Sequence, residues 1–363
     1  MKQPTTAGWP ANKETRFVQR LLHWNQTANH RQMPWKGEKD PYRIWISEII
    51  LQQTRVDQGL AYYQRFIEKF PTVQHLAGAA DHEVFKAWEG LGYYSRCKNL
   101  LASARFIVSE RKGVFPSDYQ AILQLKGVGG YTAAAIASFA FNQPYAVLDG
   151  NVFRVLARIF GLAVPVDTAA GKKTFETLAQ RLVPEGQAGT YNQAIMDFGA
   201  TVCKPTPLCP DCFFSKYCYA YLMGQQQSLP VKKKQAALRN RWFHYVVFRK
   251  KGTIAVQPRQ GKDIWQHLYE FPHIETAAGQ DILAPGKLLK EKFGLQKGDY
   301  TLLSTTARPT QKLSHQKIHF QFTVVELKKE VLLDQLHFVP LAHLNNLPFP
   351  KTLKSFITDE LGL

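Results

Sequence analysis

The sequence has no long hydrophobic run, no internal repeat and no low-complexity tract. No segment of its 363 residues approaches the ~18 apolar residues that a membrane-spanning helix needs. The stretch Met1–Phe17 lacks the hydrophobic core of a secretion signal. We therefore expect a cytoplasmic protein without a membrane anchor, and a chain of this length suggests about two domains.

Acidic residues are scarce compared with basic ones. Lysine and arginine total 46 against 28 aspartates and glutamates, which gives a net charge of +18. A surplus of this size favours a polyanionic partner, with nucleic acid first and an anionic membrane second.

Cysteine is also scarce, and its placement is uneven. Cys97 stands alone, and the other four cysteines follow the pattern Cys203-x5-Cys209-x2-Cys212-x5-Cys218. Clustered thiols in a reducing compartment indicate a metal site rather than disulfides. The spacing leaves zinc and an iron–sulfur cluster as open alternatives.

A glycine-rich hairpin and an aspartate stand at the two ends of the stretch Leu125–Asn151. Gly127 and Gly129 suit a backbone that adopts positive φ or approaches a ligand closely. The helix expected after them has N-terminal amides that suit a phosphate. Asp149 follows as the N-cap of another helix or as a functional carboxylate. Taken alone, the hairpin also fits a surface helix-turn-helix.

A second carboxylate stands in an apolar helix. Asp40-Pro41 is a strong helix start, and Glu48 lies in the sequence IWISEIIL that follows. Bulky apolar neighbours disfavour ionisation, so we expect a raised pKa for Glu48. Glu48 is then either a general acid or a structural carboxylate with a buried partner. Gln53 and Arg55, just after this helix, are able to contact bases or phosphates.

Periodicity predicts a helical region followed by a region of strands and helices. Residues 225–241 form a basic, proline-marked linker between them. Ser117 is expected to cap a short helix before the hairpin. The other expected helices are 12–24, 41–51, 59–69, 81–88, 96–110, 152–160, 172–183, 190–202, 283–293 and 351–359, and the expected strands are 243–249, 254–256 and 318–324.

These motifs resemble those of the helix-hairpin-helix DNA glycosylases, whose signature is a Leu-x-Gly-Val-Gly hairpin with an aspartate roughly twenty residues later. The segments 45–54, 88–96 and 148–152 are similar to the MutY-type adenine DNA glycosylases. The segments 268–272 and 313–315 resemble that family's Nudix-like domain, which recognises 8-oxoguanine opposite the adenine. The resemblance implies an all-α glycosylase domain over 1–224 with an iron–sulfur module near 203–218, the linker 225–241, and a small α+β Nudix-like domain over 242–363.

The resemblance also implies roles for individual residues. Glu48 would protonate adenine N7, Asp149 would stabilise an oxocarbenium-like sugar, and Tyr131 and Asn151 would position these groups. Tyr131 stands where lyase-active relatives such as endonuclease III carry a Schiff-base lysine, so base excision without strong lyase activity is expected. The residues expected to contact DNA are Trp35, Lys36, Gln53, Leu91, Tyr93, Gly127, Gly129, Gln193, Leu313, Ser314 and His315.

The expected partner is double-stranded DNA with adenine opposite 8-oxoguanine or guanine, bound by a monomeric enzyme. A [4Fe-4S] cluster on Cys203, Cys209, Cys212 and Cys218 is the expected cofactor, with a monovalent cation at the hairpin as a further expectation.

The sequence departs from the family pattern at two places. Five residues separate the first two cysteines where the family has six, which keeps zinc as the alternative metal. Leu313 stands where the family usually has phenylalanine. In addition, the stretch 287–295 offers one carboxylate where a Nudix hydrolase needs a dense acidic helix, so recognition rather than hydrolysis is expected there.

The competing hypotheses are a glycosylase for oxidised pyrimidines or mismatched thymine, and a non-catalytic DNA-binding protein.

Overall fold

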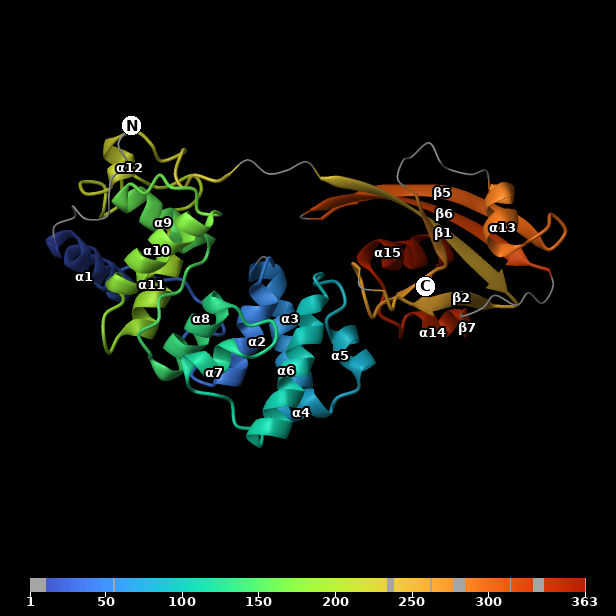
Figure 1. The fold of residues 1–363 in the computed structure, drawn as a ribbon, viewed down its shortest axis with the longest axis horizontal. Helices are drawn as coiled ribbons and strands as arrows, with labels where there is room; N and C mark the ends of the chain where they lie inside the picture. Colours follow the sequence, from blue (N-terminus) through green and yellow to red (C-terminus); the bar gives the residue numbers. More distant parts are fainter. Residues whose placement is uncertain are drawn as a thin grey trace. The chain divides into compact units, whose positions relative to one another are not determined.

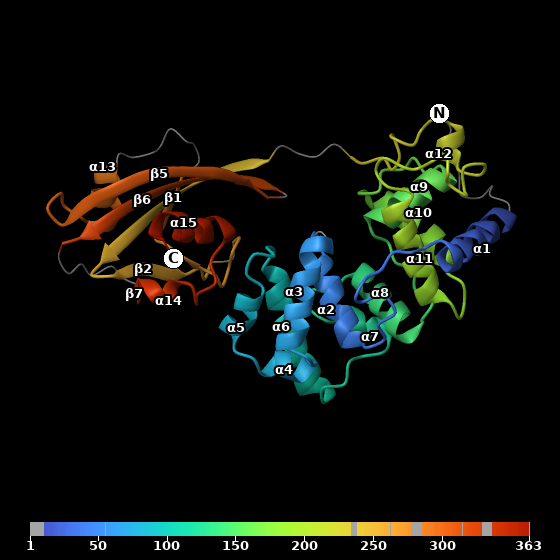
Figure 2. The same cartoon turned by 180° about the vertical axis from the view of Figure 1, so that it is seen from behind.

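The computed structural model describes residues 11–54, 56–233, 238–261, 263–276, 285–313, 315–328 and 336–362. The chain divides into two compact units, Met1–Gly78 with Asn99–Lys234, and Ala79–Lys98 with Gln235–Leu363. Figures 1 and 2 show the helices and strands of each unit from opposite sides. Within the described ranges no helix is both long enough and apolar enough to cross a membrane.

The described elements of the first unit are all helices, as the sequence predicted. Helix α6 begins in the second unit and continues into the first. The short helices α4 and α12 escaped prediction. In chain order the helices are α1 (Ala11–Thr27), α2 (Pro41–Leu51), α3 (Val56–Lys69), α4 (Val73–Gly78), α6 (Ser95–Arg111), α7 (Tyr119–Leu123), α8 (Gly130–Phe141), α9 (Gly150–Phe160), α10 (Ala169–Leu182), α11 (Ala188–Thr201) and α12 (Tyr219–Leu222).

Side-chain caps set where several of these helices begin. The Asp40 carboxylate accepts a hydrogen bond from the Tyr42 amide at 2.9 Å, which confirms the predicted start of α2. The prediction that Ser117 caps the next short helix was wrong. The cap of α7 is Asp118, whose carboxylate accepts from the Ala121 amide at 3.0 Å. Adjacent Ser and Asp are both good caps, so the sequence offered two candidates one residue apart.

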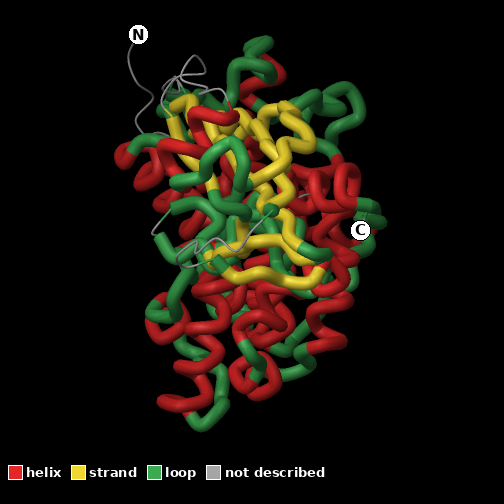
Figure 3. The backbone as a smooth tube through the Cα atoms, turned by 90° about the vertical axis from the view of Figure 1, so that its right-hand side faces the viewer, coloured by secondary structure: helices red, strands yellow, loops and turns green. Residues whose placement is uncertain are grey.

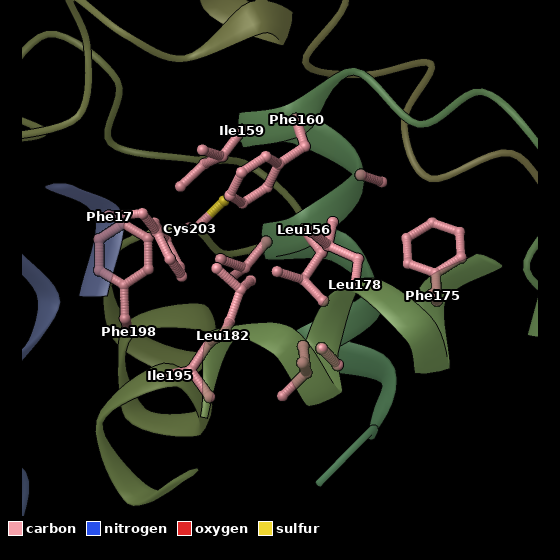
Figure 4. Packing of buried hydrophobic residues seen from close by; sticks show 14 of the residues in the cluster. Phe17, Leu156, Ile159, Phe160, Phe175, Leu178, Leu182, Ile195, Phe198 and Cys203 are labelled. Atoms are coloured by element: carbon pink, nitrogen blue, oxygen red, sulfur yellow. The ribbon is translucent and has the colours of Figure 1, made fainter. Parts of the chain in front are cut away.

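The hydrophobic core of this unit contains residues of α9, the helix that starts after Asp149, and of the cysteine segment that starts at Cys203. Figure 4 shows Leu156 and Phe160 of α9 packed with side chains of α10 and α11. Leu156 is fully buried, so its replacement by alanine should cost ~2 to 5 kcal/mol of stability. Cys203 belongs to the same cluster. The core therefore holds the start of the cysteine segment against α9.

The glycine hairpin before α8 uses its two glycines differently. Gly127 has φ of +79°, and a Cβ there would lie 2.7 Å from the Cβ of Asn99. Both observations require glycine at this position. Gly129 has φ of −97° as the N-cap of α8, so the expectation of a special backbone angle there was wrong. A Cβ at Gly129 would meet nothing within 4 Å, and the residue is exposed.

The second unit contains helix α5 (Asp81–Ala87) and a mixed sheet to which the described residues contribute seven strands. In Figure 3 the strands come together in one group. β1 and β6 are parallel neighbours in register from Arg239 opposite Gln316 to Arg249 opposite Glu326. The strand order in the sheet is β3-β2-β1-β6-β5, and in addition β4 pairs with β1 and β7 pairs with β2. The strands are β1 (Arg239–Lys250), β2 (Thr253–Pro258), β3 (Tyr269–Glu270), β4 (His273–Thr276), β5 (Tyr300–Lys312), β6 (Gln316–Leu327) and β7 (His337–Pro340).

The two faces of the sheet bury different side chains. Ile318, Phe320 and Phe322 alternate along β6 and pack on helix α15 (Lys351–Leu361), whereas Val325 packs on α13 (Pro285–Phe293) on the other face. A short helix, α14 (Leu341–Leu344), follows β7. Figure 1 shows the sheet between α13 and α15. The α+β fold predicted for this region is therefore confirmed, including the strand around 318–324 and the hairpin of β1 and β2.

Candidate active site

Glu48 lies on the buried side of α2. Only 6 % of its surface is exposed, and its neighbours along the helix are apolar. Burial, reinforced by the nearby charge of Asp149, raises the pKa of Glu48 to about 7. The carboxyl is therefore about half protonated at neutral pH. A carboxyl in this state is able to donate a proton to a bound substrate.

Tyr131 connects α8 to this carboxyl. Its hydroxyl donates a hydrogen bond to Glu48, which opposes the effect of burial on the Glu48 pKa. Burial, Glu48 and Asp149 together raise the pKa of Tyr131 well above its usual value. Tyr131 therefore stays a neutral donor, and it offers no amine for a covalent Schiff base.

Asp149 is the N-cap of α9, as the sequence allowed. Its Oδ1 accepts from the Val152 amide at 2.7 Å, and its Oδ2 accepts from the Asn151 side chain at 2.7 Å. Burial raises the pKa of Asp149, and these donors together with the Arg154 guanidinium oppose that rise. The carboxylate form is stabilised by hydrogen bonds and by the positive end of a helix.

Arg154 holds the Asn151 side chain in place. Its guanidinium donates to Asn151 Oδ1 at 2.8 Å and to the carbonyls of Gly199 and Cys203, both at 2.8 Å. Asn151 in turn donates to Asp149, so the chain of contacts fixes the orientation of the carboxylate. The sequence reasoning missed Arg154. Its spacing three residues after Asn151, on the same helix face, was the available signal.

Glu48, Tyr131, Asp149 and Asn151 line one cavity of about 690 Å³. Its volume lies in the range of small-molecule pockets and has room for a nucleobase. The structure brings most of the predicted site residues of the first unit together there. The predicted residues that line it are Trp35, Lys36, Glu48, Gln53, Tyr131, Asp149, Asn151 and Gln193.

The arrangement combines an acid and a stabilised carboxylate in the lining of one cavity. Such a pair is suited to cleaving a glycosidic bond, because one group protonates the leaving atom and the other stabilises the cationic sugar. Gln53, an exposed residue of the cavity lining, has φ of +57°, an unusual backbone angle for a residue other than glycine. Arg55 lies outside the described residues.

Comparisons with known families agree with this geometry. Residues 46–185 match the model of the HhH-GPD superfamily of base excision DNA repair proteins, and residues 244–359 match the NUDIX domain model. The chain is 34 % identical over 261 residues to an adenine DNA glycosylase of Buchnera aphidicola, covering 72 % of this chain and 75 % of the relative. This chain belongs to the adenine DNA glycosylase family. It is therefore a DNA glycosylase, an enzyme that cleaves N-glycosidic bonds.

The similarity extends to a mammalian relative and to solved structures. The adenine DNA glycosylase of Homo sapiens is 40 % identical over 225 residues, which cover 59 % of this chain and 41 % of that protein. The structure of a thermostable thymine-DNA glycosylase matches with a TM-score of 0.54 and 33 % identity, over 58 % of this chain and 98 % of that one. An endonuclease III–DNA covalent intermediate, at 20 % identity and a TM-score of 0.52, covers 60 % of this chain and 99 % of that one, and shows the shared fold.

Two predicted DNA contacts of this glycosylase lie in the turn between α5 and α6, in the second unit. Arg96 donates to the carbonyls of Leu91 and Gly92 at 3.3 and 3.2 Å, and its guanidinium lies over the Trp88 ring. Leu91 is buried under this turn, whereas Tyr93 is 42 % exposed with φ of +47°. The structure therefore presents Tyr93, rather than Leu91, at the surface.

The predicted 8-oxoguanine-reading residues lie between β5 and β6. The Leu313 amide donates to the Gln316 carbonyl at 2.8 Å, and the Leu313 side chain packs against the core of the second unit. His315 is exposed. Ser314 lies outside the described residues.

The four clustered cysteines line one small cavity beside α9. Arg158 donates to Cys203 Sγ at 3.6 Å, and it also donates to the carbonyls of Lys204 and Pro205 at 2.7 and 3.0 Å. The guanidinium thus anchors the shortened spacer after Cys203. Within the described residues no three His, Cys, Asp or Glu side chains are arranged to hold a single metal ion. Four thiols that line one space are a donor set used both by structural zinc sites and by iron–sulfur clusters.

Proposed function

We propose that the chain removes adenine from duplex DNA where the adenine is paired with 8-oxoguanine or guanine, and so prevents G:C to T:A mutation. The observation that carries the proposal is that Glu48, Tyr131 and Asp149 line the same cavity and interact with one another. Family membership and the names of the relatives support adenine as the base. Such an enzyme works where the chromosome lies, which in a bacterial-type cell is the cytoplasm.

Excision begins with extrusion of the adenine, because its glycosidic bond is out of reach inside a duplex. Glu48, protonated near neutral pH, donates its proton to N7 of the extruded base. Asp149, held ionised by its donors, stabilises the positive sugar as the bond breaks. Water then completes hydrolysis. Tyr131 supplies no amine, so the proposal includes at most weak lyase activity.

The glycine hairpin would bind the DNA backbone. Helix α8 starts at Gly129 without a side-chain cap, so its first amides are suited to a phosphate oxygen. A monovalent cation on the hairpin carbonyls remains a prediction. The turn carrying Tyr93 would support the opened duplex, and the β5–β6 loop would recognise 8-oxoguanine. Leu313 there would contribute an apolar contact without aromatic stacking.

We also propose that Cys203, Cys209, Cys212 and Cys218 hold a [4Fe-4S] cluster. The cysteine-lined cavity beside α9 supports it. When bound, the cluster would cross-link the segment from Cys203 to Cys218, which follows α11. The visible absorption spectrum and the iron content per chain test this, and stoichiometric zinc without iron would favour the alternative.

The decisive experiment measures free base release from duplexes containing adenine opposite 8-oxoguanine, guanine or thymine. A further duplex carries thymine opposite guanine, because one similar structure is that of a thymine-DNA glycosylase. The Glu48→Gln variant serves as the blank. Release of adenine opposite 8-oxoguanine and guanine is expected. Release of thymine without adenine, or release of neither base, would overturn adenine as the proposed substrate.

A further inference from the structure

A third buried carboxylate lies beside the cavity, apart from the pair described above. Asp197, on α11, has no exposed surface, although it does not line the cavity itself. Its Oδ2 accepts from Asn29 at 2.8 Å and pairs with the Lys36 ammonium at 3.0 Å. Its Oδ1 accepts from Arg31 at 2.8 Å and from Gln193 at 2.9 Å. A single carboxylate thus fixes four side chains.

Three of these partners form part of the cavity wall. Arg31 and Lys36 come from the segment between α1 and α2, whereas Gln193 lies one turn before Asp197 on α11. The Lys36 ammonium also donates to the Arg31 carbonyl at 2.9 Å, which closes the segment on itself. Asp197 therefore acts on the cavity through residues that reach it.

The contact with Asp197 decides which way the Gln193 amide faces. A carboxylate only accepts hydrogen bonds, so the Gln193 Nε2 must point to Asp197. The Gln193 Oε1 is then left to face the cavity as an acceptor. An acceptor at this position suits an exocyclic amino group and disfavours a carbonyl on the same edge of the base.

Asp197 also changes the electrostatics of the wall. Arg31 and Lys36 bring two positive charges to a cavity in which a protonated base and a cationic sugar develop. Uncompensated, these charges would oppose the transition state. The carboxylate, within 3.0 Å of both, offsets part of their field.

We propose that Asp197 is a positioning residue for base recognition, which holds Gln193 as an acceptor for the 6-amino group of adenine and offsets the charge of Arg31 and Lys36. This inference rests on the proposed excision of adenine. It predicts that the loss of Asp197 impairs excision of a 6-amino purine more than excision of a purine without that group.

The test compares single-turnover excision of adenine and of unsubstituted purine, each opposite 8-oxoguanine, by wild type and Asp197→Asn. The neutral asparagine has donors of its own, so the Gln193 amide is free to reverse. We expect the adenine-to-purine rate ratio to fall about tenfold, as for the loss of one hydrogen bond. Asp167→Asn is the matched control, because Asp167 accepts the Lys233 amide in an exposed contact away from the cavity. Its ratio should match wild type.

Gln193→Met keeps the test decisive if Asp197→Asn folds poorly. This change leaves Asp197 its three other donors and removes the acceptor, so the ratio should fall about tenfold with the melting temperature unchanged. If both variants fold, the double variant should lose no more than either single one. Equal slowing of both substrates, or effects of the two changes that multiply, would overturn the inference. Wild type that releases no adenine would instead refute the proposed function.

Discussion

Replacing Tyr131 with phenylalanine should move the alkaline limb of the pH–rate profile to higher pH. Glu48 acts only when protonated, so activity is complete well below its pKa and falls tenfold per pH unit above it. In the wild type that fall should begin at about 7. Tyr131 donates to the Glu48 carboxylate and lowers its pKa, so removal of the hydroxyl favours the protonated acid.

The size of this shift follows from the kind of bond that is lost. A hydrogen bond to a charged group contributes about 1.5 to 3 kcal/mol, and 1.36 kcal/mol corresponds to one pH unit. The Glu48 pKa should therefore rise by about 1 to 2 in the variant. At pH 9 the wild type should keep about 1 % of its plateau rate, whereas the variant should keep about 10 to 50 %.

The assay is single-turnover adenine release from pH 5 to 10, with enzyme below half-saturation so that the profile reports the free enzyme. Only the shape of the profile is compared, because the lost hydroxyl also changes the absolute rate. Tyr145→Phe is the matched control, since Tyr145 stacks on Tyr119 away from the cavity. An unchanged alkaline limb in Tyr131→Phe, or the same shift in Tyr145→Phe, would refute the reasoning.

Three further predictions concern the carboxylates, the hairpin and charge. Glu48→Gln and Asp149→Asn should each slow adenine release at least ~1000-fold. The affinity for duplex DNA in a gel-shift assay should stay within a few-fold of wild type, since asparagine at position 149 still caps α9. Near-normal adenine release would contradict the roles proposed for the two carboxyls. Gly127→Ala should lower the melting temperature by several degrees because of its positive φ and the contact with Asn99, whereas Gly129→Ala should leave it unchanged but weaken binding to duplex DNA. DNA affinity should drop at least ~10-fold between 50 and 200 mM salt, and a flat response would exclude binding dominated by phosphates.

Local rules predicted the parts of the site that depend on neighbouring residues. The caps at Asp40 and Asp149 follow from contacts two or three residues away, which a sequence displays directly. Glu48 stood out because a carboxylate among apolar residues is rare, and its pKa is raised as expected. The φ of Gly129 was predicted wrongly because glycine suits either sign of φ. The sign depends on whether the residue lies in the turn before the helix or caps the helix itself.

The same rule that singled out Glu48 would have found Asp197. Asp197 stands between the apolar residues Met196 and Phe198 of α11, yet three of its four partners come from the segment 29–36. No periodicity in the sequence indicates a contact between residues that lie so far apart in the chain. The contact between Glu48 and Tyr131 is similarly non-local. The sequence supplied both residues, and only the packing of α2 on α8 shows that they meet.

The roles proposed for the two carboxyls, Glu48 and Asp149, follow from how many hydrogen-bond donors each one has. Burial raises both pKa values, so burial alone does not separate an acid from a stabilising anion. Glu48 has Tyr131 as its donor, whereas Asp149 receives the amide of Val152 and the side chain of Asn151, at the start of a helix. A proton shared between the two is therefore expected on Glu48. In the proposed mechanism the capping geometry of α9, which local sequence sets, thus selects Glu48 rather than Asp149 as the acid.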